Sequence, residues 1–338
     1  MKKKFGAAVW GAGWVSGEHI KAYMNNPSCE VVAVGSRKES SARAKMEAAG
    51  LDCAIYTNYD ELLKDKRVNI VSICTPNDLH AVETIKAAQA GKHILIEKPV
   101  ALNLEDLAKM REAVRKAGVK TVVSFVLRWN PLFECIKGLQ QTDALGRIFM
   151  AQCDYWHPLG RWYMGYDWVT TKKSGGSMFL SAGCHSVDAI RYFVGSEVAE
   201  VSAYSNNARE CEYDANIMAI LRFENGVIGK VSASWDVANP YIFNIELFGE
   251  NGTIRNNMLY SKKLLPGQTK WTEIPTILPD SGDVTHHPFQ GEIDHLVDCI
   301  LTNKESPVNL EDAVKTHEVC IAADISAAEG RPVKLPLL

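Results

Sequence analysis

The fold of this chain is decided by the stretch Phe5-Gly6-Ala7-Ala8-Val9-Trp10-Gly11-Ala12-Gly13-Trp14-Val15-Ser16-Gly17. Its first six residues form an apolar run that predicts a buried strand, and a helical pattern follows the glycines. Gly11 permits the tight turn, Gly13 lets the backbone approach a pyrophosphate, and Ser16 fills the third, small position. A strand, a glycine-rich turn and a helix N-terminus together predict a dinucleotide-binding site. We expect four residues of the turn to contact the cofactor: Gly11, Gly13, Trp14 and Val15.

The end of the second predicted strand indicates which dinucleotide binds. Glu30-Val31-Val32-Ala33-Val34-Gly35 leads into Ser36-Arg37-Lys38, where an NAD-binding chain would carry an acidic residue for the ribose hydroxyls. A hydroxyl followed by two cations favours a 2′-phosphate. We therefore expect Ser36 and Arg37 to bind the cofactor, and we expect NADP. NAD remains possible, because Arg37 could simply stack on adenine while either cofactor fits.

Strands and helices alternate through the first third of the chain. This alternation predicts a doubly wound parallel sheet. The predicted strands are 5–10, 31–35, 70–74, 93–96 and 121–125, and the predicted helices are 40–49, 59–64, 79–90 and 104–117.

Two strand ends in this part carry candidate site residues. Thr75-Pro76-Asn77 closes the third strand, where it should line the cofactor crevice, although Asn77 could also belong to an ordinary turn. Ile94-Leu95-Ile96-Glu97-Lys98-Pro99 is an apolar run that ends on a lysine. Ligands bind outside the carboxyl ends of parallel strands, so Lys98 should lie where a nicotinamide ring would lie. The alternative is a solvated lysine at a strand end.

After residue 125 the pattern changes to strands without intervening helices. This change predicts a mostly antiparallel sheet, with Asn225-Gly226 as a hairpin turn. We therefore expect a Rossmann domain over 1–125 and a substrate-binding and oligomerisation α+β domain over 126–338. Both parities of 217–221 are apolar, which favours a homodimer or homotetramer formed through the second face of this sheet. The predicted strands are 149–155, 198–205, 217–223, 227–235, 242–249 and 252–257, and the last predicted helix is 310–329.

The stretch from Gly175 to Asp188 is the third motif with chemical potential. Its glycine-rich entry leads into a helical pattern on which His185 and Asp188, three positions apart, share a face. Histidine is the usual general base near neutral pH. The alternative is a core histidine that is hydrogen-bonded to Asp188.

Composition narrows the class of protein. The chain has 338 residues, which suggests two domains, and a net charge of −3, which gives no electrostatic case for nucleic acid or an anionic membrane. No apolar stretch approaches a membrane span. Its nine cysteines lack the C-x-x-C spacing of a metal site, and the adjacent pair His286-His287 lacks a third ligand, so we predict no metal. These features favour a cytoplasmic enzyme.

Taken together, the motifs resemble the Gfo/Idh/MocA family, the glucose–fructose oxidoreductase and myo-inositol dehydrogenase group. The resemblance implies a Rossmann domain, a C-terminal sheet domain, NAD or NADP as cofactor, and a sugar, cyclitol or related secondary alcohol as substrate. The segments that carry the resemblance are Gly11-Ala12-Gly13 with His19, Thr75-Pro76-Asn77 with His80, Glu97-Lys98-Pro99, Arg128-Trp129-Asn130-Pro131, Gly183-Cys184-His185-Ser186-Val187-Asp188 and Glu329-Gly330-Arg331-Pro332-Val333.

The resemblance also implies roles for single residues. Lys98 and His185 match the family's catalytic lysine and histidine, and Asp188 matches a position that can contact substrate. Many members carry an aspartate four residues before the histidine, where this chain has Ser181. The cofactor site is expected to include His80 and Glu97 besides Thr75, Pro76, Asn77 and Lys98, and the substrate site Arg128, Trp162, Asp188, His185 and Lys98.

The substrate clues concentrate in the aromatic stretch from Tyr155 to Trp168. Aromatic planes suit the apolar faces of sugar rings, but these side chains could equally pack a domain interface or an oligomer. We expect a dehydrogenase or reductase acting on CH–OH groups. Two alternatives are redox-assisted glycoside cleavage with a bound nicotinamide, and a non-catalytic NADP-binding sensor, which the serine at position 181 would favour.

Overall fold

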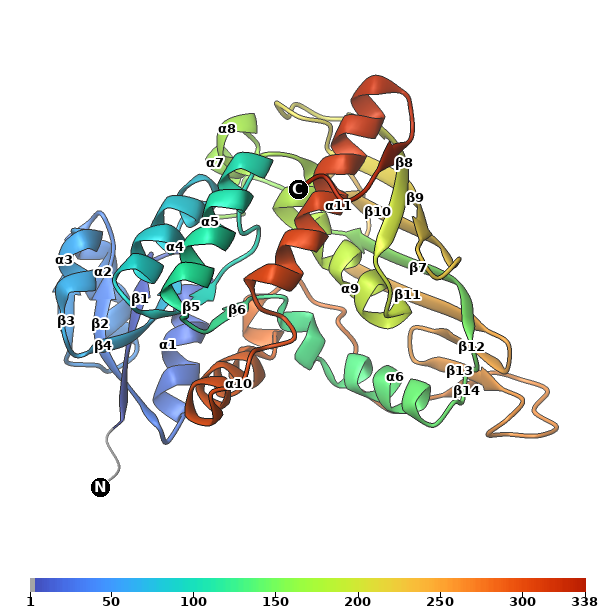
Figure 1. Cartoon of the computed structure of the whole chain (residues 1–338), viewed down its shortest axis with the longest axis horizontal. Coiled ribbons are helices and arrows are strands. Elements are labelled where there is room, and N and C mark those ends of the chain that lie inside the picture. Colours follow the sequence, from blue (N-terminus) through green and yellow to red (C-terminus); the bar gives the residue numbers. More distant parts are fainter. Residues whose placement is uncertain (1–3) are drawn as a thin grey trace. The chain divides into compact units, whose positions relative to one another are not determined.

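The computed structural model describes residues 4–338, which form two compact units (Figure 1). The first unit contains residues 4–126 together with Pro288–Val314, and the second contains Leu127–His287 together with Lys315–Leu338. The predicted division at 125/126 placed 288–314 in the second domain, whereas the structure places this segment in the first. The reason is packing, because helix α10 (Phe289–Thr302) lies against helix α1 (Ser16–Asn25) and against strands β5 (His93–Ile96) and β6 (Thr121–Val123).

The first unit is built on a six-stranded sheet in the order β3-β2-β1-β4-β5-β6, and all its strand pairs are parallel. Its strands are nearly continuous apolar runs because helices cover the sheet. Strand β3 was not predicted, since three residues are too few to show a pattern. The strands are β1 Phe5–Trp10, β2 Cys29–Gly35, β3 Ala54–Tyr56, β4 Val68–Ile73, β5 His93–Ile96 and β6 Thr121–Val123.

Helices of the first unit pack in pairs as well as on the sheet. Helix α1 contacts α10, and α4 contacts α5, which lie side by side in front of the strands in Figure 1. Asn103 caps α5 by accepting from the backbone N–H of Asp106, and Gly118 ends it at φ +65°. Besides α1 and α10, the helices of this unit are α2 Glu39–Ala48, α3 Tyr59–Lys64, α4 His80–Gln89, α5 Leu104–Ala117 and the 3₁₀ turn Asn77–Leu79.

The second unit is built on a nine-stranded sheet in the order β14-β13-β12-β11-β7-β10-β9-β8-β15. Every pair is antiparallel except β7 and β10, which run parallel. The mostly antiparallel sheet and the hairpin at Asn225-Gly226 are confirmed, and Gly226 has φ +87°. The short strands β13 to β15 were not predicted. The strands are β7 Ile148–Trp156, β8 Val198–Asn206, β9 Asn216–Phe223, β10 Ile228–Ser234, β11 Ile242–Gly249, β12 Gly252–Arg255, β13 Met258–Ser261, β14 Thr272–Glu273 and β15 Val333–Lys334.

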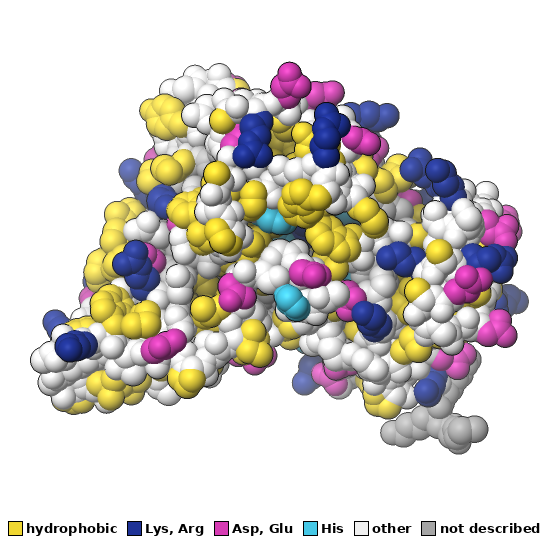
Figure 2. Space-filling view, turned by 180° about the vertical axis from the view of Figure 1, so that it is seen from behind, with side chains coloured by type: hydrophobic (Ala, Val, Ile, Leu, Met, Phe, Trp, Pro, Cys, Tyr) yellow, Lys and Arg dark blue, Asp and Glu magenta, His cyan; other side chains and the backbone are white. Residues whose placement is uncertain are grey.

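One face of this sheet is buried and the other carries exposed apolar side chains. Along β9 the odd-numbered residues are buried, while Met218 and Ile220 are 53% and 55% exposed. Tyr204 lies opposite Met218 in the register of β8 and β9, so both belong to the same open face. Figure 2, seen from behind, shows hydrophobic side chains along the outer edge of the second unit at the left of the view.

The helices of the second unit include the segment that carries the histidine motif. Within residues 4–338, no helix is long and apolar enough to cross a bilayer. Helix α11 begins in the first unit and ends in the second. The elements are the 3₁₀ turn Val126–Trp129, α6 Pro131–Gln141, α7 Tyr166–Val169, α8 Lys172–Gly175, the π-helical turn Phe179–Gly183, α9 Cys184–Val194, the 3₁₀ turn Val284–His286 and α11 Leu310–Glu329.

Candidate functional site

The turn between β1 and α1 has the geometry that its glycines predict. Gly11 has φ +104°, and a Cβ there would lie 2.3 Å from the carbonyl oxygen of Cys74, so only glycine fits. At Gly13 the nearest atom to an added Cβ is 3.5 Å away, so the fold itself would admit a side chain. Ser16 begins α1, and its hydroxyl donates to the carbonyl of Gly13 at 2.8 Å. The small residue at position 13 therefore leaves space beside the helix N-terminus for a ligand.

The sheet order creates a crevice at this turn. From β1 the chain proceeds to β2 on one side, and from β4 it proceeds to β5 on the other. In open α/β sheets such a switch point is where ligands bind, at the carboxyl ends of the strands. Gly11, Thr75 and Lys98 follow the carboxyl ends of β1, β4 and β5.

The His80 side chain links the backbones of two predicted motifs, Thr75-Pro76-Asn77 and Glu97-Lys98-Pro99. The His80 ring nitrogens lie 2.7 Å from the carbonyl oxygens of Thr75 and of Pro99. The hydroxyl of Thr75 donates to Glu83 at 2.5 Å, and the Trp10 indole donates to the other carboxylate oxygen at 2.7 Å. Burial raises the pKa of Glu83, and these two hydrogen bonds oppose that rise. Glu83, three positions after His80, was not predicted from the sequence.

Asn77 supplies a polar group that is ready for a ligand. Its side chain is 5% exposed, and its amide nitrogen Nδ2 has no hydrogen-bond partner within residues 4–338. Buried amides are rarely left unpaired, so this donor is consistent with a cofactor contact. At the end of β2, Ser36 is partly buried and Arg37 is exposed, without an acidic residue between the strand and Glu39.

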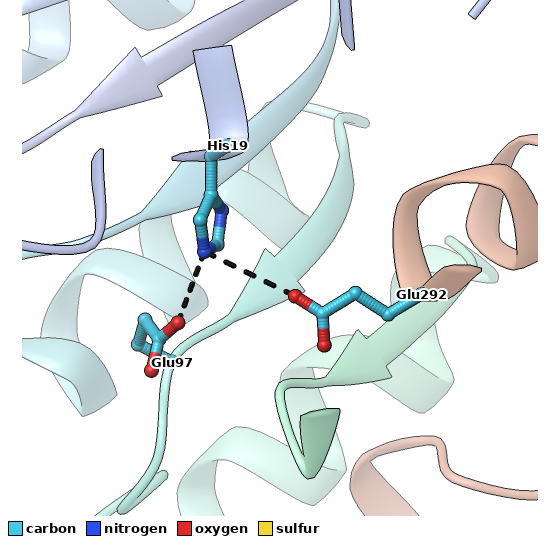
Figure 3. Close-up of side chains that lie close together, drawn as sticks. All are labelled: His19, Glu97 and Glu292. Atoms are coloured by element: carbon cyan, nitrogen blue, oxygen red, sulfur yellow. Dashed lines mark hydrogen bonds and ion pairs between the residues drawn. The ribbon is translucent and has the colours of Figure 1, made fainter. Parts of the chain in front are cut away.

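Glu97, directly before Lys98, is part of a buried cluster (Figure 3). Its Oε1 lies 3.0 Å from Nε2 of His19, and the same nitrogen lies 4.0 Å from Oε1 of Glu292 on α10. Ser124, just beyond β6, donates to that oxygen of Glu292 at 3.1 Å. The Glu97 side chain thus points into the protein interior, while Lys98 is partly exposed.

The pKa values of the two carboxyl groups in this cluster, Glu97 and Glu292, are shifted in opposite directions. Burial raises the pKa of Glu292 well above its usual range, and the negative charge of Glu97 adds to that rise. Burial also raises the pKa of Glu97, but the hydrogen bond and charge of His19 outweigh this effect and leave the pKa below its usual value. Among the described residues, these three side chains form the one group whose ligand atoms all lie within 4.8 Å, as a metal ion would require. In this structure His19 and Glu97 bind each other directly.

In the second unit, a π-helical turn precedes the histidine helix. Such turns are often found at functional sites. Ser181 lies within it and is 5% exposed, and His185 lies in the first turn of α9 and is 6% exposed. The His185 ring stacks on Tyr155, with centroids 5.9 Å apart and planes 21° apart. Tyr155 comes from β7, so the sheet orients the imidazole.

Asp188 and Arg128, both predicted to contact substrate, bind each other. Arg128 donates through Nε to Oδ2 of Asp188 at 2.8 Å and through Nη2 to Oδ1 of Asp188 at 2.6 Å. Both side chains are less than 10% exposed, and the guanidinium also lies 4.9 Å from the ring centroid of Tyr192. The pair therefore fixes the 3₁₀ turn over 126–129 against α9.

The aromatic stretch divides into buried and exposed members. Tyr155 packs edge-on against Trp235 and Tyr241, with centroids 6.4 and 5.5 Å apart. Trp162 is 62% exposed and approaches the ring of His157 at 5.9 Å. The buried rings serve the core of the second unit, whereas Trp162 presents an indole face that nothing in the core requires.

Sequence models of one family match most of the chain. Residues 5–125 match the model described as "Oxidoreductase family, NAD-binding Rossmann fold", and residues 133–255 match "GFO/IDH/MocA C-terminal domain". The chain belongs to the Gfo/Idh/MocA family. The predicted family and fold class are therefore confirmed, and this family member is an NAD(P)-binding oxidoreductase.

Curated relatives and solved structures agree with this assignment. The Gfo/Idh/MocA chain is 28% identical to scyllo-inositol 2-dehydrogenase (NAD(+)) of Bacillus subtilis, over 99% of this chain and 97% of that protein. It is 26% identical to D-xylose 1-dehydrogenase (NADP(+)) 2 of Haloferax volcanii, over 90% and 92%. Its fold matches levoglucosan dehydrogenase in complex with NADH and levoglucosan, with a TM-score of 0.88, 22% identity, and coverage of 99% and 100%.

Two residues of the Gfo/Idh/MocA chain that carry the site's electrostatics were missed from sequence. Glu292 lies in a helix with no motif, and Glu83 lies on the inner face of α4. The available signal was an acidic residue at a buried helical position, since acidic side chains are almost never fully buried unless they are paired.

Proposed function

We propose that this protein is an NADP-preferring dehydrogenase or reductase that acts on a secondary alcohol or ketone of a sugar, glycoside or cyclitol. The observation that carries the proposal is the switch point of the sheet, because the Gly11 turn, Asn77 and Lys98 follow the carboxyl ends of β1, β4 and β5, and the Asn77 amide nitrogen has no partner in the described part of the chain. The two relatives named above, an inositol and a xylose dehydrogenase, support the substrate class.

Lys98 and His185 are the proposed catalytic residues. When bound, the nicotinamide accepts or supplies the hydride. Oxidation also requires removal of the hydroxyl proton, which His185 would take, while the Lys98 ammonium would hold the oxygen and stabilise its developing negative charge. In the reductive direction His185 would return the proton.

The preference for NADP is proposed from the end of β2. Ser36 and the exposed Arg37 offer a hydroxyl and a cation to a 2′-phosphate, and no carboxylate there opposes it. The other proposed cofactor contacts are those predicted above: Gly11, Gly13, Trp14, Val15, Thr75, Pro76, Asn77, His80, Glu97 and Lys98.

Trp162 is proposed to stack on the sugar or cyclitol ring. Its exposed indole supports this role, because a largely apolar sugar face can cover it. Arg128 and Asp188 already satisfy each other, so their proposed contacts with substrate would use the donors and acceptors that remain.

The open face of the nine-stranded sheet is proposed to pair two copies of the chain, as a homodimer or as part of a homotetramer. Exposed Tyr204, Met218, Ile220 and Ile228 support this proposal, since monomers seldom expose so much contiguous apolar surface. A reducing compartment such as the cytoplasm is proposed because all nine cysteines are free thiols.

Reduced-nicotinamide absorbance tests the proposed activity. The purified protein would be mixed with NADP or NAD and a panel of sugars, glycosides and cyclitols. We expect absorbance to rise with at least one substrate, faster with NADP, and to be abolished in Lys98→Met. Lys66→Met, which changes an exposed lysine of the same unit, is the matched control and should behave as the wild type.

A flat trace with every pair, despite cofactor binding, would contradict the dehydrogenase. Ser181 gives such a result a physical meaning, because no carboxylate stands at that position to orient His185. Release of an aglycone without net cofactor reduction would then identify redox-assisted glycoside cleavage. Tight NADP binding without turnover of any compound would identify a sensor.

A further inference from the structure

The cluster of His19, Glu97 and Glu292 has a role beyond packing. We propose that Glu292 is a positioning residue for Lys98, acting through His19 and Glu97; this inference rests on the catalytic role proposed above for Lys98. Helix α10, almost 200 residues later in the chain than Lys98, would thereby help to set the lysine's position and charge environment.

A continuous path of contacts leads from Glu292 to Lys98. Ser124 donates to Glu292 Oε1, which faces His19 Nε2 at 4.0 Å (Figure 3). His19 Nε2 lies 3.0 Å from Glu97 Oε1, and Glu97 is bonded through the main chain to Lys98. The imidazole lies between two carboxyl groups, within hydrogen-bond distance of Glu97 and 4.0 Å from Glu292. Through this path Glu292 on α10 can influence where the Glu97 carboxylate lies, and with it the start of the Lys98 segment.

The cluster contains buried polar atoms without hydrogen-bond partners among the described residues, which should lower the stability of the fold. His19 and Glu292 are both 0% exposed, and His19 Nδ1 and Glu292 Oε2 have no hydrogen-bond partner in the described part of the chain. Buried polar atoms without partners destabilise a fold, and apolar residues of similar shape are often equal or better. Such a cost in a cluster that includes Glu97, the neighbour of the proposed catalytic lysine, favours a functional purpose.

The charges of the cluster suit this purpose. Burial and the charge of Glu97 raise the pKa of Glu292, whereas the hydrogen bond and charge of His19 outweigh burial and hold the pKa of Glu97 below its usual value. Glu97, whose charged form is favoured by this environment, is next to Lys98 in the chain, and its negative charge can stabilise the lysine ammonium. The remaining polar neighbours are neutral, since burial raises the pKa of the Tyr23 phenol and of the Cys74 thiol, and Tyr23 is hydrogen-bonded to Ser72.

Two substitutions of Glu292 and one control separate positioning from structure. Glu292→Leu removes the polar contacts but keeps much of the volume, while Glu292→Gln keeps a neutral acceptor for Ser124. Asp294→Asn changes an exposed residue of the same helix, which accepts from Asn26 at 2.7 Å. For each variant, kcat against pH, the Kd for NADP and the melting temperature are measured.

We expect Glu292→Leu to lower kcat at least tenfold, with the NADP Kd within threefold and the melting temperature equal or higher. Glu292→Gln and Asp294→Asn should keep kcat within threefold and the wild-type pH profile. An unchanged kcat in Glu292→Leu would overturn the proposal. So would a lower kcat that merely follows a lower melting temperature, because that result describes a structural residue.

A second readout does not depend on turnover. Lysine acylation by acetic anhydride, followed by mass spectrometry, reports the local environment of the Lys98 amine. We expect its rate to change more than threefold in Glu292→Leu but not in Glu292→Gln, while Lys66 reacts equally in all variants. An unchanged Lys98 rate would overturn the positioning role even if no sugar were turned over, so the two proposals fail separately.

Discussion

Asp188 illustrates how a single residue can be predicted as important and its partner still be missed. Its spacing from His185 made the histidine the natural neighbour, whereas the structure gives it a two-pronged ion pair with Arg128, 60 positions earlier. Sequence spacing reveals neighbours on one helix, but it carries no information about a 3₁₀ turn that packs on that helix. Lys98 differs, because its place at the end of β5 follows directly from the strand pattern.

The Arg128–Asp188 pair should contribute far more to stability than a surface pair does. Arg128→Met would remove the guanidinium that pairs with a buried carboxylate, and breaking a buried ion pair costs about 3–5 kcal/mol. Arg147→Met, which breaks an exposed pair with Glu250, should cost no more than about 1 kcal/mol. Urea unfolding followed by tryptophan fluorescence measures both losses. Equal losses would show that burial does not strengthen the dependence of Asp188 on its partner.

Asp324 on α11 should make stability depend on pH. Burial raises its pKa from 3.8 to about 7, against the opposing hydrogen bond of Ser177 and charge of Lys172. The folded state therefore keeps a proton that the unfolded chain releases near pH 4. This stabilisation is fully present below that pH and is lost as pH rises through about 7, with a slope of at most about 1.4 kcal/mol per pH unit.

Asp324→Asn should remove that contribution. Free energies of unfolding at pH 5, 6, 7 and 8 should then fall less steeply than in the wild type. Asp298→Asn, at an exposed position, serves as the control and should follow the wild-type curve. A variant curve parallel to the wild type would mean that Asp324 titrates at its ordinary pKa.

At the scale of elements, periodicity predicted most helices and strands but not which of them pack against one another. Strand β11 and helix α11 match their predicted bounds, because long runs with clear patterns leave little choice. Strand β3, with three residues, offers no period to detect. The sequence pattern of helix α10 is that of an amphipathic helix. The pattern does not indicate that its apolar face packs on α1 and β5 of the first unit.

The β1–α1 turn provides a prediction in which two glycines behave differently. Gly11→Ala would place a methyl group 2.3 Å from the Cys74 carbonyl at a positive φ, so both the melting temperature and NADP binding should fall. Gly13→Ala meets nothing closer than 3.5 Å, so the melting temperature should stay within about a degree while the NADP Kd rises at least tenfold. Calorimetry measures the melting temperature of each variant, and a binding titration measures its Kd for NADP. A destabilised Gly13→Ala would show that the fold, and not the ligand, requires that glycine.

At the scale of the whole molecule, the open face of the nine-stranded sheet should determine the oligomeric state. Light scattering should give two or four times the mass of one chain. Asp substitutions at both Met218 and Ile220 should produce monomers, because charges on that face would be buried without partners. Leu301→Asp, which alters an exposed apolar residue of α10, should leave the mass unchanged. A monomeric wild type would contradict the proposed pairing.

The return of 288–314 to the first unit has a consequence for biosynthesis. When residue 126 has left the ribosome, His19, Glu97 and Ser124 exist but Glu292 does not, and α10 has yet to cover α1. At ~5–20 residues per second, roughly ten to thirty seconds of translation separate the two parts. Throughout that interval the nascent nucleotide-binding unit exposes apolar surface and an unmatched imidazole–carboxylate pair. The ribosome thus translates residues 127–287 of the second unit before it makes the segment that completes the first unit.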